Sequence, residues 1–110
     1  MMIVQIRAKD ITLTDEKKAH IEQGIEKFKK FSLDITRVNC IVSAERAGVL
    51  VEFEIHVAHS APIVISEHHK DLDAAIDVAV DRANKALRRL HDKVTDHKGP
   101  SIKELELTDV

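Results

Sequence analysis

The chain has 110 residues, which suits a single domain, and 44% of them are hydrophobic, enough for a packed core. The three phenylalanines are its only aromatic residues, so the core must be aliphatic, and a sheet that stacks nucleotide bases, as in an RRM, is disfavoured. The formal net charge of −2 excludes recognition of a polyanion by bulk charge and leaves only a local basic patch for such a role.

The first part of the chain predicts a strand and then a helix. IVQIRAK, residues 3–9, alternates apolar and polar side chains, which is typical of a half-buried strand. From residue 15 to residue 31 the apolar residues are three and four apart, Thr14 suits the N-cap and acidic residues occupy the first turn. We therefore expect a helix there, with Gly24 inside it at a cost of up to ~1 kcal/mol relative to alanine.

Three strand-like runs follow, and then a second helix. TRVNCIVSAE, residues 36–45, is apolar at alternate positions, VLVEFEIHV, residues 49–57, alternates most clearly, and PIVIS is shorter. ERAG and AHSA between them are turn-sized, so consecutive antiparallel hairpins are expected. The apolar residues of DLDAAIDVAVDRANKALRRLHDK, residues 71–93, keep the helical period, and Gly99-Pro100 is expected to end this helix.

The predicted order of elements is therefore β-α-β-β-β-α. The first helix allows the first two strands to be parallel neighbours, and each helix has one apolar face. We expect an α+β two-layer sandwich over residues 1–98, in which both helices cover one face of a four-stranded sheet and the other face is open. Residues 99–110 are expected to form a short, acidic, disordered tail.

The last predicted helix is acidic at its start and basic in its second half. At ~100° per residue, Arg82, Lys85, Arg89 and Lys93 form a ridge beside the apolar stripe, and Arg88 lies further round. Acids at a helix start and bases at its end each stabilise it by ~0.3–1 kcal/mol, so the pattern fits a solvated charged face. The dipole effect fades beyond the last turn, yet Arg82 and Lys85 lie well before it, which fits a phosphate-binding ridge. The pattern alone leaves both interpretations open.

Other candidate residues add less. Lys27 and Lys30, near the end of the first helix, fit either an extension of a basic surface or ordinary surface positions. His91, near the end of the last helix, could add positive charge at mildly acid pH. With one cysteine and no close histidine cluster, no metal site is expected. No glycine-rich phosphate loop, no Gly-x-Ser-x-Gly elbow and no base partner for Cys40 occurs, so we expect no enzyme.

The sequence also bears on cellular location. Cys40 cannot form an internal disulfide and lies in the apolar run VNCIVS, where it is expected to be a small core residue. No segment approaches the ~18 consecutive apolar residues of a membrane span, and MMIVQIRAKD lacks the basic start and apolar middle of a signal peptide. We expect a cytoplasmic protein with no membrane partner.

Three segments carry a resemblance to a known family. ITLTDEKKAHIEQGIEKFKKF, FEIHV and especially DLDAAIDVAVDRANKALRRLHDK resemble the short ribosome hibernation-promoting factors, or ribosome-associated inhibitors, whose older name is sigma-54 modulation protein. The resemblance covers about residues 2 to 95. It implies a fold similar to a double-stranded-RNA-binding domain. It also implies binding in the mRNA and tRNA channel of the small ribosomal subunit, with repression of translation in stationary phase or stress.

The resemblance also implies a set of site residues, because family members place basic residues of both helices on rRNA phosphates. By position, the matching residues are Arg82, Lys85, Arg89, Lys93, Lys27 and Lys30, with the neighbouring Arg88 and with His91 where a lysine is common. Gly24 stands where lysine is frequent and Asp73 where tyrosine is frequent, which could weaken the contacts of the first helix and of the start of the second helix. No cofactor and no small-molecule substrate are implied, and a monomer is expected away from the ribosome.

Two questions stay open at this level. The twelve residues from Gly99 to Val110 are too few for the dimerisation domain of long family members, and the sequence does not decide between pairing ribosomes and keeping single ribosomes inactive. The alternative function is a generic protein-interaction module that uses the exposed sheet face or an edge strand.

Overall fold

The computed structural model describes residues 2–98, with side chains described as far as Val94. The expected tail over residues 99–110, with Gly99-Pro100, lies outside the described residues. The elements in chain order are β1 (Ile3–Lys9), α1 (Asp15–Glu26), the 3-10 helix η1 (Lys27–Phe31), β2 (Ile35–Glu45), β3 (Gly48–Val57), β4 (Ile63–His69) and α2 (Leu72–Lys98).

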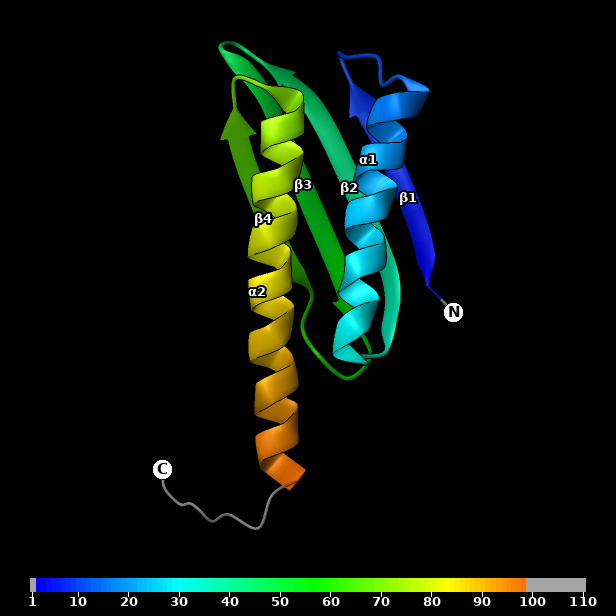
Figure 1. Ribbon diagram of the computed structural model, residues 1–110, viewed down its shortest axis with the longest axis vertical. Coiled ribbons are helices and arrows are strands. Elements are labelled where there is room, and N and C mark those ends of the chain that lie inside the picture. The colour runs from blue at the N-terminus through cyan, green and yellow to red at the C-terminus, as the bar shows by residue number, and fades with distance from the viewer. Residues whose placement is uncertain (1, 99–110) are drawn as a thin grey trace.

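The four strands form one sheet in the order β1-β2-β3-β4. β1 and β2 are parallel, whereas the other two pairs are antiparallel. One row of the register joins Ile6, Cys40, Phe53 and Ile65 across all the strands. Both helices lie side by side on the same face of this sheet (Figure 1). The predicted α+β two-layer sandwich with an open sheet face is confirmed.

The core lies between the sheet and the two helices. Its fully buried strand residues alternate along β2 and β3, as predicted: Val38, Cys40, Val42, Val51, Phe53 and Ile55. The ring of Phe28 meets that of Phe53 edge to face, with 5.8 Å between the centroids. Burial raises the pKa of the Cys40 thiol to about 12, so this side chain is an inert core group.

β1 is more exposed than its alternation predicts. Ile6 is partly buried, but Val4, which was expected to lie inside with it, is 38% exposed. The reason is its position at the edge of the sheet, where a strand has a neighbour on one side only.

The helix predicted from residue 15 to residue 31 changes its geometry near its end. Thr14 caps α1 by accepting a hydrogen bond from the Lys17 N–H, as predicted. The α-helix then ends at Glu26 and continues as the tighter η1, which is followed by Ser32 in the left-handed region. The two phenylalanines of η1 are buried in the core, so this turn fastens the end of the first helix to the sheet.

α2 runs past the end of the sheet, so its C-terminal part is uncovered on the sheet side (Figure 1). Its first turn is capped by Asp71, whose carboxylate accepts the Ala74 N–H at 2.9 Å. The predicted apolar stripe is buried from Ala75 to Leu87, Leu90 is half-buried, and Val94 is 42% exposed because it lies beyond the core. α2 therefore presents its basic half to solvent.

Candidate nucleic-acid interface

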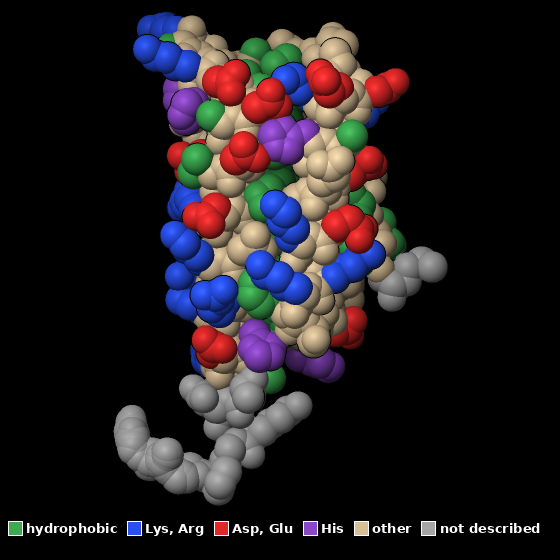
Figure 2. Space-filling view, in the orientation of Figure 1, with side chains coloured by type: hydrophobic (Ala, Val, Ile, Leu, Met, Phe, Trp, Pro, Cys, Tyr) green, Lys and Arg blue, Asp and Glu red, His purple; other side chains and the backbone are tan. Residues whose placement is uncertain are grey.

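Charges are separated along the two-helix face of the molecule. Lys and Arg side chains gather over the lower half of this face, along α2 and η1, and Asp and Glu are most frequent at the upper end, where both helices begin and where further Lys and Arg side chains also lie (Figure 2). We call the cations of the lower half, with His91, the basic surface: Lys27, Lys30, Arg82, Lys85, Arg88, Arg89, His91 and Lys93. All of them are exposed except His91, which is half-buried.

A groove between the helices gathers one part of the basic surface. Lys27 and Gly24 line it from the first helical segment, and Asp81 and Asn84 line it from α2, around a volume of about 390 Å³. Residues four and seven positions after Asn84 lie on the same side of α2. Arg88 and His91 therefore continue the groove side beyond Asn84, toward η1, which α2 contacts.

The opposite side of α2 carries another part. Arg82 lies beside β4, where its Nη1 donates to the Glu67 carboxylate at 2.8 Å and to the Ser66 carbonyl at 2.7 Å. Arg89 and Lys93 follow on this side by helical spacing. The cations of the expected ridge are Arg82, Lys85, Arg89 and Lys93. They are not equally available to a ligand, because the Glu67 carboxylate already neutralises the charge of Arg82.

The remaining cations differ in how far they are engaged. Lys85 forms an i,i+4 ion pair with Asp81 at 3.3 Å, and both side chains are well exposed. Lys30 places its Nζ 5.2 Å from the centre of the Phe31 ring. In the part of the chain that the structure describes, no carboxylate forms an ion pair with the others: Lys27, Arg88, Arg89 and Lys93. These charges are available to an anionic partner.

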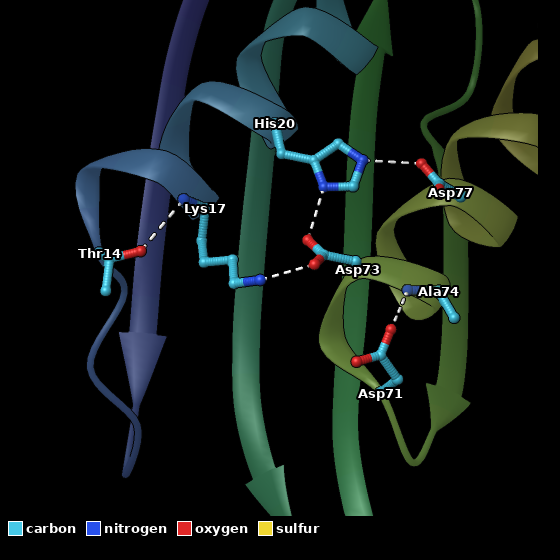
Figure 3. Close-up of polar contacts among 7 residues, drawn as sticks. All are labelled: Thr14, Lys17, His20, Asp71, Asp73, Ala74 and Asp77. Carbon is cyan, nitrogen blue, oxygen red and sulfur yellow. Dashed lines mark hydrogen bonds and ion pairs between the residues drawn. The ribbon is translucent and has the colours of Figure 1, made fainter.

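At the acidic end, four side chains join α1 to α2, and we call them the interhelix clasp (Figure 3). Lys17 Nζ lies 2.6 Å from Asp73 Oδ2, and the ring of His20 lies between Asp73 and Asp77. Its Nδ1 is 2.8 Å from Asp73 Oδ1, and its Nε2 is 2.7 Å from Asp77 Oδ1. Asp73 is thus the centre of a contact between the helices.

The clasp changes the protonation of its members. The hydrogen bond from Lys17, followed by that from His20, holds the pKa of Asp73 below its usual value of 3.8. The same bond raises the pKa of Lys17. Partial burial acts to lower the pKa of His20, but its bonds to Asp73 and Asp77 outweigh this, and the pKa is raised above 6.5. Both carboxylates thus favour the charged imidazolium.

Sequence reasoning found no close histidine cluster, gave His20 no role and missed the clasp. The partners on the two helices lie more than fifty residues apart in the sequence: His20 is 53 residues from Asp73 and 57 from Asp77. The available signal was that Lys17 and His20 share one face of α1 while Asp73 and Asp77 share one face of α2. Opposite charges at helical spacing predict such a contact only once the two helices are known to be neighbours.

The open sheet face is mainly polar. Asn39 donates to the Glu54 carboxylate at 3.1 Å, and His56 Nε2 lies 3.5 Å from the same group. These bonds, led by that from Asn39, hold the pKa of Glu54 below its usual value. The described residues include no group of three or more His, Cys, Asp or Glu placed to hold a metal ion. Nor does any helix among them have the length and apolarity to cross a bilayer.

Comparisons with known proteins agree with this architecture. A curated relative, the ribosome hibernation promoting factor of Azotobacter vinelandii, is 28% identical over 92 residues, which cover 84% of this chain and 85% of that protein. The crystal structure of the N-terminal domain of Thermus thermophilus Protein Y has a TM-score of 0.72 at 22% identity, covering 82% of this chain and 99% of that one. A ribosomal subunit interface protein from Coxiella burnetii has a TM-score of 0.73 at 12% identity, with 82% and 97% covered.

These two structures establish likeness of fold. Family membership follows from the sequence itself, since the profile of one family matches residues 4–95, nearly all of the residues that the structure describes. The chain belongs to the sigma 54 modulation protein / S30EA ribosomal protein family.

Proposed function

We propose that the chain binds the small ribosomal subunit in the channel where mRNA and tRNA would sit, and represses translation there in stationary phase or stress. One observation carries the proposal. The exposed cations Lys27, Arg88, Arg89 and Lys93 lie at one end of the two-helix face and form no ion pair among the described residues. Such a surface matches folded RNA, whose phosphates line its grooves.

The mechanism is steric. Arginine and lysine side chains make charge-assisted hydrogen bonds to rRNA phosphates, and the rigid domain then fills space that translation ligands need. Because the C-terminal part of α2 runs past the end of the sheet, these contacts can form without the sheet touching the RNA (Figure 1). No chemical step, cofactor or small-molecule substrate is needed, and a cytoplasmic monomer suffices.

The comparisons support the ribosome as the partner. The Azotobacter relative is named a ribosome hibernation promoting factor, and the Coxiella protein is named a ribosomal subunit interface protein. The choice of the small subunit and of its channel rests on the resemblance described above. Basic residues on both helices, the shared feature of that resemblance, are present here on η1 and α2.

The test is a charge reversal on the groove side. A variant with Lys27→Glu, Lys30→Glu and Arg88→Glu is sedimented with small subunits, large subunits and whole ribosomes. We expect loss of binding to the small subunit by more than tenfold, because several phosphate contacts are lost together. Unchanged co-migration of the variant would contradict the proposal.

A matched control separates position from net charge. Lys9→Glu, Arg46→Glu and Lys70→Glu change the charge by the same amount at exposed positions outside the basic surface. This control variant is expected to retain most of the binding. If both variants lose affinity equally, binding follows overall charge and not the basic surface.

A second candidate is a protein-interaction module that uses the edge strand β4. Val64 on this strand is 55% exposed, and an edge strand can pair with an extended partner segment. A partner that remains bound after ribonuclease treatment, and that is lost on Val64→Pro, would favour this function over ribosome binding. Proline at that position removes a backbone donor.

A further inference from the structure

The geometry of His20 demands a particular protonation state. Both ring nitrogens lie within 2.8 Å of carboxylate oxygens, one from Asp73 and one from Asp77. Ionised carboxylates only accept hydrogen bonds, and a neutral imidazole can donate from one nitrogen only. The observed arrangement therefore requires the doubly protonated imidazolium. In the neutral ring, a lone pair would face a carboxylate oxygen at less than 3 Å.

The position of the clasp links it to the basic surface. Four residues after His20, Gly24 meets Val80, and three residues later Lys27 begins η1. The clasp near the helix starts and the Gly24–Val80 contact in the middle set α1 against α2, and the buried phenylalanines of η1 hold the end of this helical segment to the sheet. His20 and Lys27 line the same groove between the helices. If the clasp opens, the start of α1 is free to move away from α2, the groove changes width, and Lys27 shifts relative to Arg88.

We propose that His20 is a positioning residue for the basic surface: in its doubly protonated form it bridges Asp73 and Asp77 and holds α1 against α2, and RNA binding weakens when it loses the second ring proton. This inference rests on the proposed function, since the property it regulates is affinity for rRNA. His20 itself touches no RNA. It acts through the spacing between η1 and α2.

The charged neighbours of His20 favour the protonated ring, and with it the closed clasp, in mildly acid solution. On its own helical segment it is flanked by Glu16, Lys17 and Lys27, and α2 presents Asp73, Asp77 and Asp81. The acids of α2 outweigh the nearby cations. Because its pKa is raised above 6.5, His20 keeps its charge at pH 6 and loses it only as the pH rises through that raised pKa.

The experiment measures affinity for purified small subunits at pH 6.0 and pH 8.0 in the full-length protein. For the wild type we expect binding to weaken by about threefold to fivefold at the higher pH, the range that exposed ion pairs contribute. His20→Gln carries no charge and cannot bridge the two carboxylates as the imidazolium does. We expect it to bind small subunits at the weaker level, with a smaller change in affinity between the two pH values. The other histidines are common to both proteins, so the difference between their pH profiles isolates His20.

His20→Arg is the decisive variant. Its guanidinium keeps its charge at every pH used and can donate to two carboxylates, so we expect the tighter affinity at both pH values. If this arginine instead contacted RNA directly, the dependence of log affinity on log salt would become steeper by about one unit. An unchanged salt slope with restored affinity supports positioning. A steeper slope overturns it. His68→Gln, an exposed position on β4, is the matched control and should retain the wild-type pH profile.

A second measurement separates this inference from the proposed function. In the free protein, NMR titration of the His20 ring should be accompanied by shifts of the Lys27 and Lys30 amides with the same midpoint, and by none in His20→Gln. If these amides do not respond, or if wild-type affinity is equal at the two pH values while the groove-side charge reversal abolishes binding, the clasp does not position the surface. In that case ribosome binding still stands. If the wild type fails to bind ribosomes at all, the proposed function fails, and the amide shifts alone decide whether the clasp works.

Discussion

Gly24 of α1 lies directly against Val80 of α2, so close that a Cβ at position 24 would come within 2.5 Å of Val80 Cγ2. Valine is branched at Cβ and cannot easily turn its methyl groups away. Only glycine allows the two helices to approach this closely here. Gly24 lowers the helix propensity of α1, as the sequence predicts, but its missing side chain is what allows α1 and α2 to pack this closely.

Gly24→Ala is expected to destabilise the protein by ~1–3 kcal/mol, because overpacking outweighs the gain in helix propensity. Urea unfolding measures this change. In a Val80→Ala background the added methyl has room, and the same substitution should be neutral or stabilising by up to ~1 kcal/mol. A destabilisation that persists in that background would show that the Gly24–Val80 contact is not the cause.

Asp73→Asn should flatten the pH dependence of stability. The folded-state pKa of His20 is raised, so its contribution is complete below about pH 6.5 and disappears as the pH rises through the folded value. The folded-state pKa of Asp73 is lowered, so its contribution is present above about pH 3.8 and disappears as the pH falls through the folded value. The clasp thus stabilises most between these limits. Urea midpoints at pH 5.5 and pH 8 should differ less in Asp73→Asn than in the wild type.

Arg82 and Arg88 should contribute unequally to RNA binding. Arg88→Gln is expected to reduce the salt dependence of ribosome affinity by about one unit, the value of one phosphate contact. Arg82→Gln should change it less, because Glu67 already offsets this charge at 2.8 Å. Glu67→Gln releases Arg82 and should strengthen binding. Equal salt slopes for the two arginine variants would mean that Arg82 leaves Glu67 on the ribosome.

Cys40 should be unreactive in the folded protein. Its thiol is buried in the sheet, and its pKa of about 12 leaves almost no thiolate near neutral pH. Reaction with a thiol reagent should therefore proceed only through opening of the structure and should accelerate as urea is added. Rapid labelling in native buffer would contradict the burial. Cys40→Ser, which places a hydroxyl in this apolar site, should destabilise by ~1–3 kcal/mol.

The sequence predicted correctly those helices and strands in which the apolar residues repeat at one regular spacing along the whole element. The alternation in β3 and the apolar stripe of α2 each depend on neighbours within the same segment, and both were predicted correctly. β4 was predicted too short, because the strand-like run PIVIS ends at Ser66. The strand itself continues through the polar residues that follow, to His69. Its pairing with β3 supports that polar end, which local composition does not indicate.

The pairings within the candidate site depend on contacts that no local pattern contains. Whether Glu67 reaches Arg82 depends on the register of β4, since a shift by one residue would turn Glu67 to the open face. Likewise, the burial of Val80 against α1 depends on the absent side chain at Gly24, which lies on another helix. The basic residues were found by residue type and spacing. Whether each of them forms an ion pair with a carboxylate of the same chain follows only from the folded structure.

The separation of charge along the two-helix face has a consequence for how quickly the protein finds a partner. A molecule whose net charge is −2 should be repelled by a polyanion at long range. Cations are in excess at one end and acids at the other, however, so the field of the polyanion exerts a torque that turns the more cationic end forward before contact (Figure 2). Encounters are thereby biased toward one orientation, and added salt should slow association more than it speeds release.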